Sequence, residues 1–226
     1  MSARTPVLLA WSGGKDAAWT LHVLRRLGEV EVVGLLCTIT REYDRASMQG
    51  IRRGVLQAQA RAAGLPLLVA DIPARCTNDD YERAMADALA RARRRWPGLH
   101  TMASGDLLLA DIRAYRARSL AHAGWDLLTP LFGRDTTMLA REMLREGLHA
   151  HLCCVDTQQL AAGFAGRTFD DALLDALPAG VDRCGENGEF HTCVQAGPMF
   201  DAPLVLARGE TVLREGRFAF TDFVCE

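Results

Sequence analysis

The sequence almost lacks lysine. Of its 26 lysine and arginine residues, 25 are arginines and one is a lysine, Lys15. Lysine presents a compact point charge and arginine a planar fork, so the two are not interchangeable where a cation must fit beside phosphates. The single lysine stands in the stretch Ser12-Gly13-Gly14-Lys15-Asp16. The scarcity of lysine elsewhere makes this stretch the first candidate for a functional site.

Paired cysteines and long apolar runs are also missing. The seven cysteines are odd in number and form no CxxC pair, which argues against a disulfide framework or a zinc knuckle and predicts reduced thiols. No window reaches the roughly 20 apolar residues of a membrane helix, and the apolar run at 6–11 is too short for the core of a signal peptide. We therefore expect a cytoplasmic protein with no membrane partner.

The chain has no large excess of charge of either sign. The net charge is −2 over 226 residues, with 24% charged and 49% hydrophobic residues. A general nucleic-acid binder carries a strongly basic surface, so nucleic acid is not expected as a partner. The length and the apolar content suit one large domain or two small ones with a sizeable core.

Apolar segments alternate with helical patterns over the first 132 residues. Strands are predicted at 6–11, 30–38, 66–72, 100–104 and 126–128. Helices are predicted at 16–27, 48–63, 78–95 and 108–123, the third of them capped by Asn78 or Asp79. Alternation of this kind predicts an α/β fold, with a parallel sheet that carries helices on both faces and ligand-binding loops at one edge.

The pattern loosens after residue 132. Helices are predicted at 136–146 and 170–177 with a strand at 149–155 between them, followed by segments 204–207 and 217–223 that pair as antiparallel strands. We therefore divide the chain into a domain of residues 1–132 and a smaller α+β domain of residues 133–226.

The stretch Ser12-Gly13-Gly14-Lys15-Asp16 lies between a predicted strand and a predicted helix. A glycine turn at a helix start presents backbone N–H groups and the positive end of the helix dipole to an anion. Lys15 adds a charge and Ser12 a hydroxyl donor. The order of residues differs from the Walker A loop, in which four residues separate the first glycine from Gly-Lys. A purely structural glycine turn remains the alternative.

A second candidate site is the stretch Cys184-Gly185-Glu186-Asn187-Gly188-Glu189-Phe190-His191-Thr192. It places two acids, an amide, a histidine and a hydroxyl between glycines that free the backbone. Acids in this setting bind Mg²⁺, bind an amine or ammonia, or act as a base. A solvated turn with incidental acids is the alternative.

Two further positions follow the fourth predicted strand. Gly105-Asp106 stands at the edge of the sheet where ligands bind in such folds, although Asp106 also suits a helix N-cap. Arg113, on the helix that follows, suits bidentate binding of a phosphate or carboxylate, or a solvated helix face.

Taken together, these motifs resemble those of a known family. Residues 12–16 are similar to the SGGxD loop of the PP-loop ATP pyrophosphatases, and the whole set is similar to the diphthine–ammonia ligase family. The other matching stretches, in family order, are Met48-Gln49-Gly50, Gly105-Asp106, Asp111-Ile112-Arg113, Tyr115-Arg116, Pro130-Leu131, Gly166-Arg167 and Gly185 to Thr192. They span nearly the whole chain.

The resemblance implies a fold of the HUP type, similar to the adenine nucleotide alpha hydrolases. Residues 1–132 would bind ATP through the PP-loop, and residues 133–226 would bind the substrate. ATP would be split into AMP and pyrophosphate to adenylate a carboxylate or carbonyl, borne by a small molecule or a protein, and ammonia would then form an amide. ATP and Mg²⁺ are thus the expected cofactors.

The resemblance also implies roles for individual residues. Ser12 to Asp16, Gly105 and Asp106 would contact ATP, and Lys15 would stabilise the phosphate charge. Glu186 and Glu189 would orient or deprotonate ammonia, and together with Asp16 they are the candidates for Mg²⁺. Substrate contacts would come from Arg113, Gly185, Glu186, Asn187, Gly188, Glu189, His191 and Thr192.

The chain departs from the family pattern at three places. Ala17 stands where a serine or threonine is usual, so one hydroxyl contact to phosphate is missing. Gln49 stands where histidine is frequent. Phe190-His191-Thr192 stands where Glu-Thr is frequent, which suits a short bacterial or archaeal type. The acceptor and the oligomeric state, a homodimer included, stay open.

Two other functions compete with the ligase. A PP-loop enzyme that modifies tRNA would need a basic surface and a sulfur-carrying cysteine, commonly paired, and neither is indicated. A nucleotide-binding sensor without chemistry is the other alternative, because a fold does not determine a function.

Overall fold

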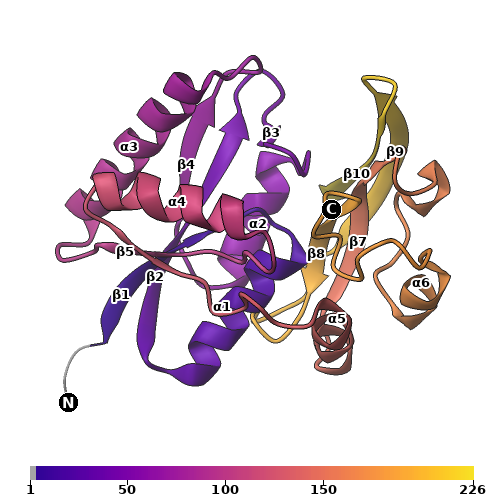
Figure 1. Cartoon of the computed structure of the whole chain (residues 1–226), viewed down its shortest axis with the longest axis horizontal. Helices are drawn as coiled ribbons and strands as arrows, with labels where there is room; N and C mark the ends of the chain where they lie inside the picture. Colours follow the sequence, from indigo (N-terminus) through magenta and orange to yellow (C-terminus); the bar gives the residue numbers. More distant parts are fainter. Residues whose placement is uncertain (1–3) are drawn as a thin grey trace.

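The computed structural model describes residues 4–226 and contains two sheets that stand side by side. Figure 1 shows the first sheet, with its helices, in the half that holds the N-terminus, and the second sheet in the other half. The change from one sheet to the other falls between strand β6, Asp126–Leu128, and strand β7, His149–Asp156. Our division of the chain at residue 132 lies in this interval and stays a prediction.

The first sheet is mostly parallel, as predicted. Strand β1 lies at its centre, with β2 on one side and β5 on the other, and β6 and β4 complete the parallel part. The short strand β3 pairs with the end of β2 in the antiparallel sense. The bounds are Thr5–Ala10 for β1, Val30–Thr40 for β2, Arg45–Ala46 for β3, Leu67–Ile72 for β4 and Thr101–Ala103 for β5.

Helices cover both faces of this sheet, as predicted. Alternate side chains of β1 point to opposite faces, so Val7 and Leu9 join one core and Leu8 the other. Helices α1 and α2 pack on the first of these cores, and α3 and α4 pack on the second. Their bounds are Lys15–Leu27, Arg53–Ala62, Asn78–Arg95 and Ala110–His122.

Two predicted helix starts need correction. Helix α3 is capped by Thr77 rather than by Asn78 or Asp79: the Thr77 hydroxyl accepts from the N–H of Asp80 at 3.2 Å, and the Asp80 carboxylate accepts from the N–H of Thr77 at 3.2 Å. Helix α2 begins at Arg53 rather than at residue 48. The left-handed backbone of Met48, with φ of 73°, and of Gly50, with φ of 70°, cannot belong to a helix.

The second sheet is antiparallel, with strand order β8-β7-β10-β9. Strands β9, Leu206–Arg214, and β10, Phe218–Cys225, pair as predicted, although β9 runs seven residues past the predicted end at 207. Strand β8 spans Phe190–Ala196. Helices α5, Thr136–Arg145, and α6, Asp171–Ala176, pack on this sheet, and a 3₁₀ turn, η1, spans Ala162–Phe164.

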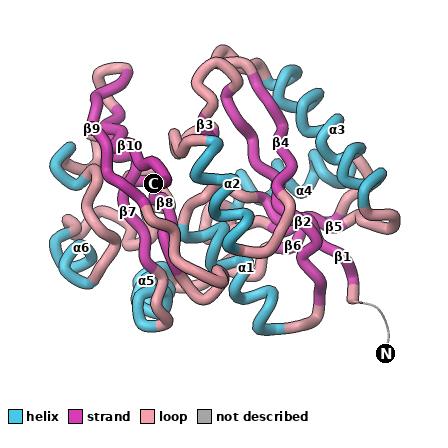
Figure 2. Tube along the Cα trace, turned by 180° about the vertical axis from the view of Figure 1, so that it is seen from behind, coloured by secondary structure: helices cyan, strands magenta, loops and turns pink. Residues whose placement is uncertain are grey.

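Helices α1 and α2 lie between the two sheets (Figure 2). One apolar core runs through this layer, because side chains of β1, α1 and α2 belong to the same cluster as those of β7, β8 and α6. Close packing is visible at Gly50, where a Cβ atom would lie 2.8 Å from the ring of Phe220. The two halves of the chain are therefore packed together over a common core.

No helix within residues 4–226 combines the length and the apolar character that crossing a membrane requires.

A carboxylate of the second sheet joins the two halves at the surface. Asp222 on β10 accepts from Arg45 at 2.8 Å and from Arg52 at 2.6 Å. Burial alone would raise the pKa of Asp222, but these hydrogen bonds outweigh burial and lower it from 3.8 to about 2. A carboxylate whose pKa is lower in the folded state stabilises the fold above the unfolded value and loses that contribution as the pH falls through the folded value.

We therefore predict that Asp222→Asn lowers the free energy of unfolding at pH 7 by about 1–2 kcal/mol. Between pH 4 and pH 2 the unchanged protein should lose more stability than the variant by a similar amount, because the other carboxylates titrate in both proteins, and urea unfolding across this range can measure the difference. Asp87→Asn is the control, because Asp87 is 68% exposed and pairs with Arg91 only within one helix. Equal effects of the two substitutions would contradict the account.

Candidate functional site

A cavity of about 940 Å³ opens at the carboxyl edge of the first sheet. The first domain forms its floor with the ends of β1, β2 and β5 and the start of α1, and the second domain contributes the loop before β8. The volume lies within the range of about 300–1,000 Å³ that is usual for small-molecule sites. The polar residues that line it include Ser12, Lys15, Asp16, Ser104, Asp106, Arg116, Glu186, Asn187, His191 and Thr192.

The glycine loop, residues 12–16, contributes to the wall of this cavity. Gly13 has a φ of 79°, which glycine adopts without strain, and the N–H of Gly14 donates to the Ser12 hydroxyl at 3.2 Å. Within the described residues, the N–H groups of Gly13, Asp16 and Ala17 find no acceptor in any other residue, and of these three residues Asp16 and Ala17 line the cavity. Unpaired N–H groups at a helix start attract an anion, and the predicted contact of this loop with ATP stays a prediction.

Lys15 is buried beneath this loop, with 2% of its surface exposed. Its ammonium group donates to both carboxylate oxygens of Asp16, at 2.9 and 2.8 Å, and to the carbonyl of Cys184 in the second domain. The rings of Phe169 and Phe190 lie 5.8 and 5.7 Å from the nitrogen. Burial alone would lower the pKa of Lys15, but the charge of Asp16 reverses this effect and raises it, so the lysine is charged.

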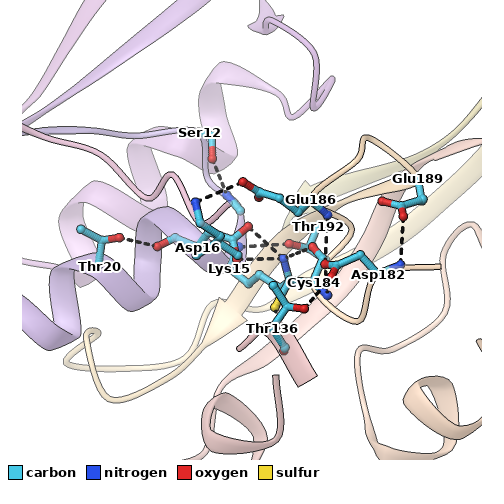
Figure 3. A network of polar contacts seen from close by, with 12 residues as sticks. Ser12, Lys15, Asp16, Thr20, Thr136, Asp182, Cys184, Glu186, Glu189 and Thr192 are labelled. Atoms are coloured by element: carbon cyan, nitrogen blue, oxygen red, sulfur yellow. Dashed lines mark hydrogen bonds and ion pairs between the residues drawn. The ribbon is translucent and has the colours of Figure 1, made fainter. Parts of the chain in front are cut away.

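The second domain holds the loop through two further hydrogen bonds. The N–H of Lys15, in the first turn of α1, donates to the Thr192 hydroxyl at 3.0 Å. The N–H of Val194 donates to the carbonyl of Gly13 at 3.0 Å. Figure 3 shows how Thr192, Cys184 and Lys15 meet. The two stretches that the sequence singled out, 12–16 and 185–192, are therefore in direct contact.

Glu186 faces the cavity from the second domain. One of its oxygens, Oε1, accepts from the N–H groups of Leu107 and Leu108 at 3.1 and 2.9 Å, which ties the loop to the segment before α4. Burial raises the pKa of Glu186, and the two N–H groups only partly offset this effect. The predicted position of Glu186 in the cleft with Lys15 is therefore found.

Glu189 does not face the cavity, so its position does not support the expected role in orienting or deprotonating ammonia. Its side chain is 2% exposed, and it turns toward Asp182 (Figure 3). Oε1 accepts from the N–H of Asp182 at 2.9 Å and from the Asn187 amide at 3.1 Å, and Oε2 accepts from the N–H of Asn187 at 2.9 Å. Through these hydrogen bonds, Glu189 fixes the conformation of the loop that carries Glu186.

The rest of this loop splits into cavity residues and shaping residues. Asn187, Gly188 and His191 line the cavity. Burial lowers the pKa of His191 to about 4, so this side chain is neutral at pH 7. Gly185 has a φ of 71°, and a Cβ there would lie 2.7 Å from the carbonyl of Phe190, so only glycine fits.

Gly105 and Asp106 lie against the glycine loop, but their contacts are with the protein itself. A Cβ at Gly105 would lie 2.8 Å from the carbonyl of Asp16, so this glycine lets β5 approach the start of α1. Asp106 pairs with Arg116 at 3.1 Å and accepts from the Ser104 hydroxyl at 2.7 Å. Both residues line the cavity, and the predicted contact with ATP stays a prediction.

Arg113 lies outside the cavity, contrary to expectation. Its guanidinium stacks on the ring of Phe132, 4.6 Å from the centroid, and donates to the Thr129 hydroxyl at 2.8 Å. Arg116, one turn later on α4, lines the cavity instead. The sequence placed both arginines on the same helix but could not show which of them faces the site.

A buried side chain that the sequence analysis missed is Gln59 of α2. It is 0% exposed and bonds to the glycine loop and to β8. The only sequence signal was a polar residue on the apolar face of a predicted helix.

The described side chains do not form a cluster of metal ligands for Mg²⁺. Within the described residues, no group of three histidine, cysteine or acidic side chains is arranged to hold a metal ion. Of the three proposed ligands, Asp16 is paired with Lys15 and Glu189 lies outside the cavity. The described side chains therefore do not form a complete magnesium site by themselves.

Comparison with known proteins finds two family models that match different parts of the chain. Residues 4–117 match the model of the diphthamide synthase N-terminal domain, and residues 135–219 match that of the diphthamide synthase C-terminal domain. The chain is also similar to the diphthine–ammonia ligase of Schizosaccharomyces pombe, with 27% identity over 218 residues. The similarity covers 89% of this chain and 36% of that relative. With family models matched in both domains, the chain belongs to the diphthamide synthase family.

Proposed function

We propose that this protein is an ATP-dependent ligase that forms an amide from a carboxylate and ammonia, with AMP and pyrophosphate as the other products. The observation that carries the proposal is the start of α1, where Asp16 and Ala17 line a cavity large enough for a nucleotide and their N–H groups find no acceptor in any other residue. The similarity to the diphthine–ammonia ligase of Schizosaccharomyces pombe supports the same reaction class.

The chemistry explains why ATP is required. A carboxylate and ammonia do not condense in neutral water, because hydroxide is a poor leaving group. An oxygen of the carboxylate attacks the α-phosphorus of ATP, the α–β bond breaks, and pyrophosphate leaves. Ammonia then attacks the carbonyl carbon of the acyl-adenylate, AMP leaves, and the nitrogen loses a proton. A loop that holds the β- and γ-phosphates stabilises the charge that grows on departing pyrophosphate.

Lys15 acts on the phosphates through Asp16. A bare carboxylate beside the loop would repel an anion, and the ammonium 2.8 Å away cancels that charge. Because the ammonium is buried and hydrogen-bonded on both sides of the domain interface, it is not free to follow the substrate. Lys15 therefore keeps the loop receptive to anions. No step is assigned to Mg²⁺, because no group of three histidine, cysteine or acidic side chains within residues 4–226 is arranged to hold it.

Glu186 is the base of the second step. Ammonia is mostly protonated at neutral pH and must lose a proton before it attacks. Burial raises the pKa of Glu186, which makes its carboxylate a better proton acceptor than an exposed glutamate. Oε1 is anchored by the N–H groups of Leu107 and Leu108, which leaves Oε2 to receive the cation.

The competing functions find less support. A sulfur-inserting enzyme needs a reactive thiolate, but burial raises the pKa of Cys37 to about 12 and also raises that of Cys76, and these two thiols line the cavity. A third cavity residue, Cys184, is buried and its pKa is raised to about 12. A sensor without chemistry would bind ATP but form no products, so an assay for turnover distinguishes it from a ligase.

The product test uses ATP labelled at the α-phosphate and a panel of carboxylates that includes a diphthine-bearing peptide, with ammonium as the nitrogen source. We expect labelled AMP, unlabelled pyrophosphate and an amide, all dependent on the acceptor. Labelled ADP with orthophosphate would rule out the mechanism. ATP binding without turnover on any acceptor would favour the sensor.

Removal of the Lys15 charge tests its role. We expect Lys15→Met to raise the Kd for ATP by roughly tenfold to a hundredfold, because Asp16 is left as an unpaired carboxylate beside the phosphates. The double variant Lys15→Met, Asp16→Asn should recover most of this loss in calorimetry. Both variants lack the bond to Cys184, so their difference isolates the charge of Asp16. Unchanged affinity in the single variant would contradict the assignment, and a double variant no better than the single one would mean that Lys15 acts on phosphate directly.

The two glutamates of the second motif should respond differently to the same substitution. Glu186→Gln keeps an oxygen for Leu107 and Leu108 but cannot take a proton, so amide formation should slow by about 10²–10⁴ with ATP affinity nearly unchanged. Glu189→Gln should instead lower the melting temperature, because the N–H groups of Asp182 and Asn187 lose their charge-assisted hydrogen bonds to the carboxylate. Weaker ATP binding by Glu186→Gln would point to a metal-binding role. Equal rates of amide formation in the two variants would contradict the role of Glu186 as the base.

A further inference from the structure

A buried amide reaches the glycine loop from the side opposite the cavity. Gln59 is fully buried on α2 among the apolar side chains of Val55, Leu56 and Ala60, and it does not line the cavity. Its nitrogen donates to the carbonyl of Gly13 at 3.0 Å. Burying an amide is costly unless its nitrogen and oxygen find hydrogen-bond partners. Both atoms of the Gln59 amide have partners.

The other two bonds of Gln59 tie it to both domains. Its nitrogen also donates to the carbonyl of Val194 on β8 at 2.8 Å, and its oxygen accepts from the indole of Trp11 at 3.1 Å. Gln59 thus joins the end of β1, the glycine loop and the second sheet at one point. The carbonyl of Gly13 receives a second bond there, from the N–H of Val194 at 3.0 Å.

The peptide between Gly13 and Gly14 is the part of the loop that is easiest to turn. Neither flanking residue has a Cβ atom, so rotation of this peptide meets little steric resistance. In a planar trans peptide the carbonyl and the N–H point in opposite directions. With the Gly13 carbonyl fixed toward β8, the N–H of Gly14 points to the other side, where the Ser12 hydroxyl accepts it at 3.2 Å at the cavity wall.

A turned peptide would present its carbonyl to the anion site and repel a phosphate. We propose that Gln59 is a positioning residue that holds the Gly13–Gly14 peptide in the orientation that accepts phosphate. The proposal rests on the proposed function insofar as residues 12–17 bind the phosphates of ATP. Gln59 itself contacts neither the nucleotide nor the acceptor, because it acts from behind the loop.

The test compares Gln59→Met with Val55→Ala in the full-length chain. Methionine has a similar length and volume but donates no hydrogen bond. Val55 lies on the same face of α2, is 2% exposed and does not line the cavity, so Val55→Ala destabilises the same helix without touching Gly13. The Kd values of ATP and of inorganic pyrophosphate are measured by calorimetry, well below the melting temperature of each variant.

We expect Gln59→Met to raise both Kd values by about fivefold to twentyfold, which corresponds to the loss of a hydrogen bond that orients the loop. Val55→Ala should keep both Kd values even if its melting temperature falls equally. Equal Kd values for Gln59→Met and the unchanged protein would overturn the proposal, and so would an equal loss of affinity in Val55→Ala. Failure of the unchanged protein to bind ATP and pyrophosphate would instead contradict the proposed function.

Gln59→Asn covers the case in which the methionine variant does not fold. It keeps an amide in the buried space but is one methylene shorter, so it cannot bond to Gly13 and Val194 together at the present backbone positions. A rise in the Kd for pyrophosphate, with the Gly13 carbonyl turned toward the cavity in the crystal structure of this variant, would support the proposal. Unchanged affinity with an unchanged peptide would overturn it.

Discussion

The ammonium group of Lys15 is buried where the two domains meet, and the site depends on how that charge is paired. Taking a charge out of water costs several kcal/mol unless a partner and hydrogen bonds replace the water. Asp16 supplies the opposite charge, and Cys184 supplies a carbonyl from the second domain. The pairing removes a negative charge from the phosphate loop, and it also links the two domains at the point where the cavity forms.

This constraint explains why two motifs far apart in the sequence act as one unit. The first domain offers unpaired N–H groups at the start of α1, but its glycine loop is easily deformed. The second domain fixes that loop through Thr192 and Val194, and it brings Glu186 to the cavity wall. Phosphate binding and proton transfer are therefore assigned to different domains, and neither domain alone contains both parts.

Much of the fold was predictable because local patterns agree with it. Apolar strands alternating with helices indicate a parallel sheet, and a glycine turn with one lysine indicates an anion site at its edge. Side-chain direction was not predictable, because it depends on contacts distant in sequence. Glu186 and Glu189 look equivalent in the sequence, yet only Glu186 faces the cavity. Arg113 stacks on Phe132 outside the cavity. Gln59 is a single polar residue whose hydrogen-bond partners lie in other elements.

A structure with an ATP analogue that cannot be cleaved between the α- and β-phosphates tests the central claim most directly. The account predicts the β- and γ-phosphates on the N–H groups of Asp16 and Ala17, with the α-phosphate open toward Glu186. The ammonium of Lys15 should remain buried against Asp16. Phosphates bound away from residues 12–17, or an adenine ring in their place, would contradict the account.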